Sequence, residues 1–207
     1  AVYPCDVLRN QVADLAVLDC AYGHDSTLWN DSVTAAAAAV ENLLEKTPIV
    51  FLPVPKYGRG LDLLLQIRRR LPYVPLYGDA HFCKQTEIAL VDGKWYKPLP
   101  QRILRRVRPD AAENEGVVFL SDPQLRGAVG ERAKELLEQG AMGIMTGTPD
   151  AGSFSSALLA EKKMEFWRYP VHLNETQCRV LAEKNNFSQV LRYHSPNFAS
   201  PHRITMK

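Results

Sequence analysis

One aspartate and two histidines stand at the ends of apolar segments, where their side chains could act together in chemistry. Asp19 ends one apolar run, His172 follows a second at 164–171, and His194 follows a third at 188–193. In α/β folds, ligand sites assemble at the carboxyl ends of strands. A carboxylate and two imidazoles can supply a metal ligand, a general acid and a group that orients an imidazole. The alternative is that each histidine is an ordinary hydrogen-bonded residue.

Glycine-bearing turns ahead of two predicted helices form a second kind of candidate site. Gly58 and Arg59 open one helix, and the segment 146–153, which contains Thr148 and Ser153, opens another. Backbone amides and hydroxyls at the start of a helix can bind a phosphate group. Neither turn matches a P-loop or a dinucleotide-binding fingerprint, so plain turn chemistry is the alternative for both.

Arginines are concentrated in two runs, Arg68–Arg70 and Arg102–Arg108. The chain as a whole has a formal net charge of only +2, so its total charge indicates neither a nucleic-acid nor a membrane partner. Such a role would need a local patch. The two runs are interpreted either as solvated helix faces or as a rim that contacts phosphate groups.

The composition is typical of a soluble globular protein, with 46% hydrophobic and 23% charged residues in a chain of 207. The cysteines Cys5, Cys20, Cys83 and Cys178 lack CxxC spacing, so we predict neither a zinc knuckle nor a disulfide framework, and a reducing cytoplasm fits best. No segment reaches the roughly 18 apolar residues of a membrane span, and no signal peptide is recognised. A start at Ala1 rather than Met suggests a processed, excised or partial sequence.

Strand and helix patterns alternate along the chain, which predicts an α/β fold with a largely parallel sheet. The predicted strands are 13–19, 48–53, 74–77, 116–120, 142–145, 164–171 and 188–193. The predicted helices are 27–46, 61–71, 122–139, 153–162 and 175–185. Residues 80–115 show no clear pattern beyond a hairpin-type turn at Asp92-Gly93.

Five segments occur in an order that is typical of one known family. Residues 13–23 form a strand that ends in an acid followed by a small residue, Tyr and Gly, and residues 57–65 form a Gly-Arg turn that enters a leucine-rich helix. Residues 71–78 form a proline-bearing strand, and 172–177 and 191–195 each contain one histidine motif. In this order the chain resembles the β-CASP nuclease group of the metallo-β-lactamase-fold hydrolases over nearly its whole length.

The resemblance implies a role for each of the three strand-end residues. Asp19 matches an acid that orients a catalytic histidine, and His172 matches a histidine proposed as a general acid or phosphate contact. His194 matches a zinc ligand of the RNA-processing branch, where the DNA-repair branch tends to have Val. The short acid at Asp19 is more typical of the DNA branch. Arg59, Asn174, Thr148 and Ser153 are the candidate phosphate-binding residues.

The family's metal signature, His-x-His-x-Asp-His, does not occur in the chain. In the family it lies before the position of Asp19, as do a further metal-binding His and a bridging Asp. The resemblance therefore implies two zinc ions per complete site, with His194 as a ligand and most other ligands upstream of this chain.

We therefore predict an α/β protein with metallo-β-lactamase-like sheet elements, an incomplete domain of residues 1–47 and 164–207, and an inserted parallel-sheet β-CASP-like domain of residues 48–163. The predicted function is that of a metal-dependent phosphodiester hydrolase, a cytoplasmic ribonuclease that acts on single-stranded RNA. No membrane partner is expected, and a homo-oligomer stays open.

Two alternative functions stay open. One is a non-catalytic nucleic-acid-binding or assembly module of the same fold, and the other is a metallohydrolase of small esters, because a fold does not fix a function. We also expect marginal solubility for the isolated chain, since a sheet cut from its other half exposes an apolar face and an open strand edge.

Overall fold

The computed structural model of the protein describes residues 8–23, 25, 29–91, 106–111, 115–194 and 203–205. The chain divides into two compact units. Of the described residues, those within 30–169 belong to the larger unit, and those within 8–29 and 170–205 belong to the smaller unit.

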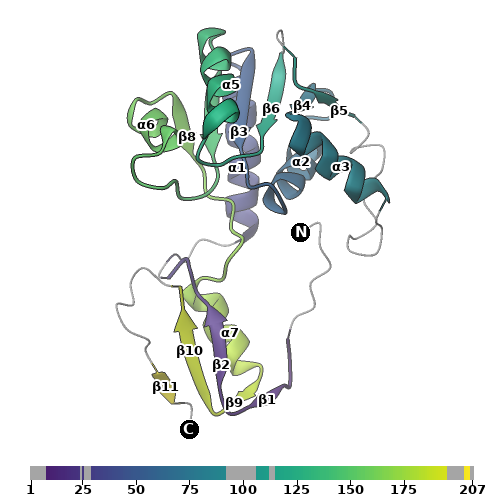
Figure 1. Ribbon diagram of the computed structural model, residues 1–207. Coiled ribbons are helices and arrows are strands. Elements are labelled where there is room, and N and C mark those ends of the chain that lie inside the picture. The colour runs from purple at the N-terminus through teal and green to yellow at the C-terminus, as the bar shows by residue number, and fades with distance from the viewer. Residues whose placement is uncertain are drawn as a thin grey trace. The chain divides into compact units, whose positions relative to one another are not determined.

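The elements follow one another in the order shown in Figure 1. They are β1 (Val12–Ala13), β2 (Ala16–Asp19), α1 (Trp29–Leu44), β3 (Ile49–Pro53), α2 (Arg59–Arg70), β4 (Leu76–Gly78), α3 (Ala80–Val91), β5 (Val107–Pro109), β6 (Gly116–Leu120), α5 (Gly127–Glu138), β7 (Met142–Met145), α6 (Phe154–Ala160), β8 (Met164–Phe166), α7 (Glu175–Glu183), β9 (Asn186–Phe187), β10 (Gln189–Tyr193) and β11 (Arg203–Thr205).

The larger unit is built on a six-stranded sheet in the order β5-β4-β6-β3-β7-β8. Every neighbouring pair of strands in this sheet is parallel. Helices follow β3, β4, β6 and β7, as parallel connections require. The predicted α/β class with a largely parallel sheet is confirmed. The finer assignment to the metallo-β-lactamase and β-CASP folds, with its domain boundaries, stays a prediction.

Both faces of this sheet are buried. All residues of β3 and β6 are buried, which explains why these strands are continuous apolar runs in the sequence. Ile49 and Phe51 belong to a core cluster with residues of α5 and α6. Alternate residues point to the opposite face, where Phe119 stacks on Phe82 of α3 with 4.4 Å between the ring centroids. Figure 1 shows α5 and α1 on opposite faces of the sheet.

The start of α5 is the largest difference between the predicted and observed elements of this unit. The helix begins at Gly127 and not at Asp122. The Asp122 carboxylate accepts a hydrogen bond from the backbone N–H of Arg126 at 3.2 Å, and Leu125 and Gly127 have φ angles of 54° and 53°. A left-handed residue interrupts a right-handed helix, so residues 122–126 form a turn and the helix starts only at Gly127. The helix ends near Gly140, as predicted, where φ is 82°.

The smaller unit contains a three-stranded sheet in the order β11-β10-β2, and the helix α7. Strand β10 runs parallel to β2 and antiparallel to β11, and β1 pairs separately with β9. The core of this unit is formed by Leu18, Cys20, Cys178, Ala182, Phe187 and Val190. The prediction of a buried strand that delivers Asp19 was wrong in one respect, because β2 is only partly buried and Val17 is 56% exposed.

Several features are defined only within the described ranges. None of the helices found there has both the length and the apolar character that a membrane crossing needs. Cys20, Cys83 and Cys178 are free thiols. The unassigned segment 80–115 contains α3 and β5. The turn predicted at Asp92-Gly93 lies outside the described residues.

Candidate functional site

Asp19 and His194 lie at the same edge of the smaller unit's sheet. Strands β2 and β10 are parallel, and Tyr193 is the register partner of Asp19. The two strands therefore end side by side, β2 at Asp19 and β10 at Tyr193, and His194 is the residue after β10. The expected meeting of these two strand ends is confirmed.

His172 reaches this edge from a loop rather than from a strand end. The strand β8 ends at Phe166, so the prediction of an extended segment as far as Val171 was wrong. Pro170, which has no N–H to continue a strand ladder, is also the residue at which the chain enters the smaller unit. His172 lies two residues beyond it, just ahead of α7.

Tyr22 holds the loop that carries His172. Its hydroxyl accepts a hydrogen bond from the backbone N–H of Val171 at 3.1 Å, and its own N–H donates to the carbonyl oxygen of Leu173 at 3.4 Å. Its ring packs edge-on against the imidazole of His172, with 5.5 Å between the centroids. Tyr22, which follows the end of β2, thus positions His172.

The side chains of Asp19, His172 and His194 converge in the smaller unit. One potential ligand atom from each lies within 4.8 Å of the others. The Nδ1 atom of His172 is 2.8 Å from Oδ2 of Asp19, a hydrogen-bonding distance. The Nδ1 atom of His194 is 3.6 Å from Oδ1 of the same carboxylate. The two imidazole rings meet edge to face at 5.5 Å, so one carboxylate faces both histidines.

The backbone helps to hold Asp19 and His194 in place. The N–H of Ala21 donates to Oδ1 of Asp19 at 3.1 Å. His194 has a φ of 60°, a left-handed conformation that costs a residue with a side chain on the order of 1–3 kcal/mol. Residues held in such conformations are frequent at functional sites, so the backbone at His194 is a second indication that this edge is a site.

Solvent reaches all three side chains. His172, Asp19 and His194 are 33%, 47% and 60% exposed. An ion or a substrate can therefore approach the donor atoms without any rearrangement of the core.

Two buried thiols lie behind the cluster. Cys178 donates a weak hydrogen bond to the backbone oxygen of Asp19, with 3.8 Å between sulfur and oxygen. Burial, followed by the neighbouring Cys20, raises the pKa of the Cys178 thiol to about 12. Cys178 is 1% exposed and packs in the core with Cys20, and it is not among the converging donor side chains.

The chemistry of the donor set fits a transition metal. Two imidazoles and a carboxylate are ligands that zinc accepts, and a tetrahedral zinc with bonds near 2.1 Å would place its ligand atoms roughly 3.4 Å apart. The ligand atoms of the three side chains lie within 4.8 Å of one another in the structure. Elsewhere in the described part of the chain, no group of three or more His, Cys, Asp or Glu side chains has this geometry.

The second candidate site lies in the larger unit, between the ends of β3 and β7. These strands are neighbours, and their connections lead to opposite sides of the sheet, to β4 and β8. Two neighbouring strands whose connections leave in opposite directions form a topological switch point. Open α/β sheets bind ligands at the carboxyl ends of such strands. Arg59 begins α2 here, and a Cβ atom added at Gly147 would overlap its guanidinium group. Thr146, in the same loop, is fully buried and its hydroxyl has no hydrogen-bond partner.

The other predicted phosphate-binding residues have different surroundings. Thr148 is exposed in the loop after β7. Ser153 caps α6, and its hydroxyl oxygen accepts from the N–H of Ser156 at 3.2 Å. Asn174 is buried and caps α7 in a capping box, in which its side chain accepts from the N–H of Gln177 at 2.9 Å. Arg59 and Thr148 therefore share one edge, whereas Asn174 orders the helix that follows His172.

Tyr22 and Thr146 are functional candidates that were not predicted individually. Tyr22 belongs to the acid, small residue, Tyr, Gly segment, so the order of residues contained a signal for it. The sequence contained no signal for Thr146. Only the structure shows that its hydroxyl is buried without a hydrogen-bond partner among the described residues.

No protein-family model matches the chain, and no curated protein is significantly similar to it. The roles inferred from the β-CASP resemblance therefore rest on the residues and geometry described above.

Proposed function

We propose that the chain contributes part of the active site of a metal-dependent phosphodiester hydrolase that acts on single-stranded RNA. The observation that carries the proposal is the convergence of Asp19, His172 and His194, with donor atoms within 4.8 Å of one another. The β-CASP resemblance supplies the reaction and the substrate class.

Asp19 and His172 would act as a pair. The contact between His172 Nδ1 and Asp19 Oδ2 makes Nδ1 the donor nitrogen, which leaves Nε2 as the nitrogen that exchanges a proton with the substrate. His172 would donate this proton to the leaving oxygen of the cleaved phosphodiester. The Asp19 carboxylate would orient the ring. General acid catalysis of this kind contributes about 10²–10⁴-fold in rate.

His194 is the proposed metal ligand of the set. When bound, zinc would supply a hydroxide nucleophile and neutralise charge on the phosphoryl oxygens. Because two zinc ions need more donors than these side chains provide, the proposal requires further ligands. The family resemblance places them ahead of Asp19.

The switch-point loops support a phosphate-bearing substrate independently of the metal. Arg59 supplies a positive charge beside the start of α2, and amides at a helix start favour anions. A cytoplasmic location and a homo-oligomer stay predictions.

RNA cleavage tests this function, measured with zinc-loaded protein in its longest natural form. His172→Ala should lower the cleavage rate by about 10²–10⁴-fold. His81→Ala is the matched control, since His81 lies in the larger unit and packs against Tyr57; it should keep the full rate. Equal rates for both variants would contradict the role of His172.

The same assay separates the alternatives. Faster turnover of a small phosphoester than of RNA would favour the small-ester metallohydrolase. Binding of RNA with neither metal nor cleavage would favour the non-catalytic module.

A further inference from the structure

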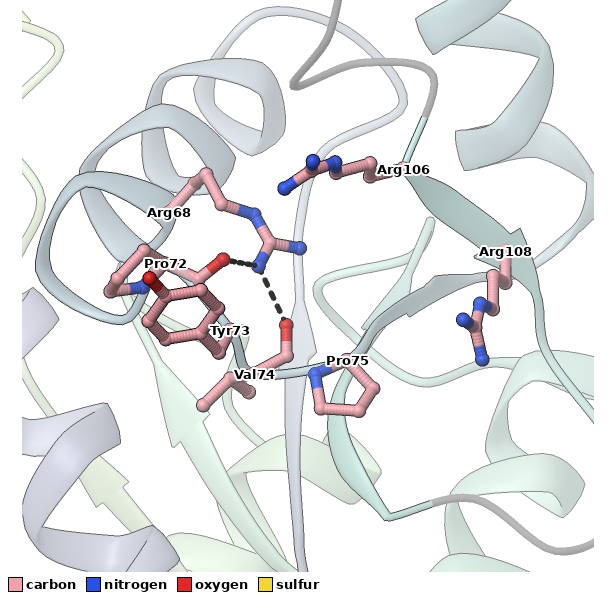
Figure 2. Close-up of a pocket in the computed structure, with 7 residues that line it drawn as sticks. All are labelled: Arg68, Pro72, Tyr73, Val74, Pro75, Arg106 and Arg108. Carbon is pink, nitrogen blue, oxygen red and sulfur yellow. Dashed lines mark hydrogen bonds between the residues drawn. The ribbon is translucent and has the colours of Figure 1, made fainter.

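A pocket of about 380 Å³ lies in the larger unit, where β4 and β5 begin. It is lined by Arg68, Pro72, Tyr73, Val74, Pro75, Arg106 and Arg108 (Figure 2). Because the strands are parallel, this edge of the sheet is opposite to the one that carries Arg59 and the loop after β7. The pocket is therefore separate from the switch point.

Arg68 carries a buried charge that no described carboxylate neutralises. It is only 7% exposed. Its Nη1 atom donates to the carbonyl oxygens of Pro72 and Val74, both at 2.8 Å, and its Nε atom is buried without a hydrogen-bond partner. Carbonyl oxygens satisfy donors but supply no negative charge. An anion that entered the pocket would supply that charge.

The other two arginines add to this positive charge. Figure 2 shows the guanidinium groups of Arg68 and Arg106 extending toward one another, with Arg108 farther along β5. Burial, and then the charge of Arg106, lower the pKa of Arg68. None of the described lining residues is acidic, so like charges gather among them.

Three arginines elsewhere in the larger unit have carboxylate partners. Arg70 pairs with Glu41, Arg126 with Asp122, and Arg132 with Asp110. The contrast within one helix is informative, because Arg70 and Arg68 both lie in α2. An unpaired cluster of arginines in a pocket fits an anionic ligand better than a structural role alone.

An aromatic residue beside the arginines narrows the class of ligand. The Tyr73 side chain is 92% exposed although it lines the pocket. Guanidinium groups bind phosphate oxygens in pairs, and exposed aromatic rings stack on nucleic-acid bases. A phosphate and a base together are what a nucleotide offers.

We propose that this pocket binds a nucleotide unit of a single-stranded nucleic acid, with its phosphate at Arg106 and Arg108 beside Arg68 and its base on Tyr73. The site shares a substrate class with the proposed function but requires neither the metal nor hydrolysis. It gives the larger unit a strand-binding role of its own.

Fluorescence anisotropy with a labelled oligouridylate of about ten nucleotides tests the proposal. Arg106→Ala and Arg108→Ala should each weaken binding roughly tenfold and lower the slope of log affinity against log salt by about one. Tyr73→Ala should weaken binding about five- to a hundredfold. Arg68 is not substituted, because it also holds the backbone carbonyls of Pro72 and Val74.

Arg70→Ala is the matched control, since it removes the same charge from α2 outside the pocket. Binding should be unchanged in this variant. If Arg70→Ala weakens binding as much as Arg106→Ala, or if no substitution weakens it, the pocket is not the site.

Competition identifies the ligand. Uridine monophosphate should displace the strand when present in excess, whereas polyglutamate of equal charge should not. Equal displacement by polyglutamate would overturn the nucleotide assignment in favour of an unspecific anion site.

Strand binding by the wild type, measured with and without added zinc, keeps this test apart from the proposed hydrolase. The affinity for the strand should be the same in both conditions. A failure of cleavage would then leave the strand-binding result intact, and loss of binding without zinc would contradict the independence of the pocket.

Discussion

The larger unit buries both faces of its sheet, whereas the smaller unit leaves one strand of its sheet largely open to solvent. Every residue of β3 is buried, but Leu18 is the one buried residue of β2. When strand side chains are fully used in packing, functional groups are confined to loops and edges. In the smaller unit, Asp19 is the last residue of β2 and His194 comes directly after β10.

Polar side chains differ between the units in the same way. In the larger unit, Arg132 and Asp110 form a two-bonded pair, with contacts of 2.7 and 2.9 Å, and both are mostly buried. In the smaller unit Asp19 faces two histidines and solvent. The first arrangement holds elements together, and the second leaves ring nitrogens available for chemistry. Four changes test this contrast.

A large-to-small substitution in the core should show the largest difference in stability effect between the two units. Phe51→Ala in β3 removes a fully buried ring and should lower the free energy of unfolding by about 4 kcal/mol. Val17→Ala in β2, at an exposed position, should change it by less than about 0.5 kcal/mol. Urea unfolding measures both, and similar losses would remove the contrast in packing.

Breaking the buried ion pair should have the next largest effect. Arg132→Ala leaves Asp110 without its partner and should cost about 3 kcal/mol. Asp19→Asn removes an exposed charge and should cost less than about 1 kcal/mol. A large loss of stability in Asp19→Asn would mean that the Asp19 cluster is structural.

Alkaline pH should act on the larger unit through Tyr169. Burial, and then the charge of Asp62, raise the pKa of this phenol above its ordinary value of 10.0. Since the phenol ionises first in the unfolded chain, the stabilisation is complete below pH 10 and is lost as pH rises above it, by about 1 kcal/mol at pH 11. Tyr169→Phe should reduce the fall in unfolding free energy between pH 9 and 11. Tyr57→Phe, at an exposed position, should leave that fall unchanged.

The helix cap next to His172 should have the smallest effect. Asn174→Ala removes a capping box from α7 and should cost about 1 kcal/mol, whereas Asn174→Gly should cost only a few tenths. Thermal unfolding followed by circular dichroism measures this difference. Equal losses in the two variants would show that the role of Asn174 goes beyond the cap.

The placement of Asp19 and His194 could be predicted because each follows an apolar run, and parallel strands bring such ends together. His172 was expected at the same edge and lies there, but its approach from a loop could not be predicted, since the loop depends on contacts with Tyr22, distant in the sequence. The late start of α5 likewise depends on side-chain bonds from Asp122.

The arginine pocket shows a further limit of sequence patterns. The run Arg68–Arg70 gave no means of distinguishing its members. In the structure Arg68 is buried in the pocket, and Arg70 pairs with Glu41 outside it. Arg68 bonds to the nearby carbonyls of Pro72 and Val74, whereas the partner of Arg70 comes from α1, an earlier helix of the chain.

Zinc binding by the longest natural form of the protein is the most direct test of the central claim, that His194 is a metal ligand beside the paired Asp19 and His172. Titration against a chromophoric chelator should detect zinc bound by the wild type and by His81→Ala, and affinity weakened at least about ten- to a hundredfold in His194→Ala and in Asp19→Ala. Equal zinc affinity in all four proteins, or no bound zinc in any of them, would contradict the claim and leave the three residues as a structural contact.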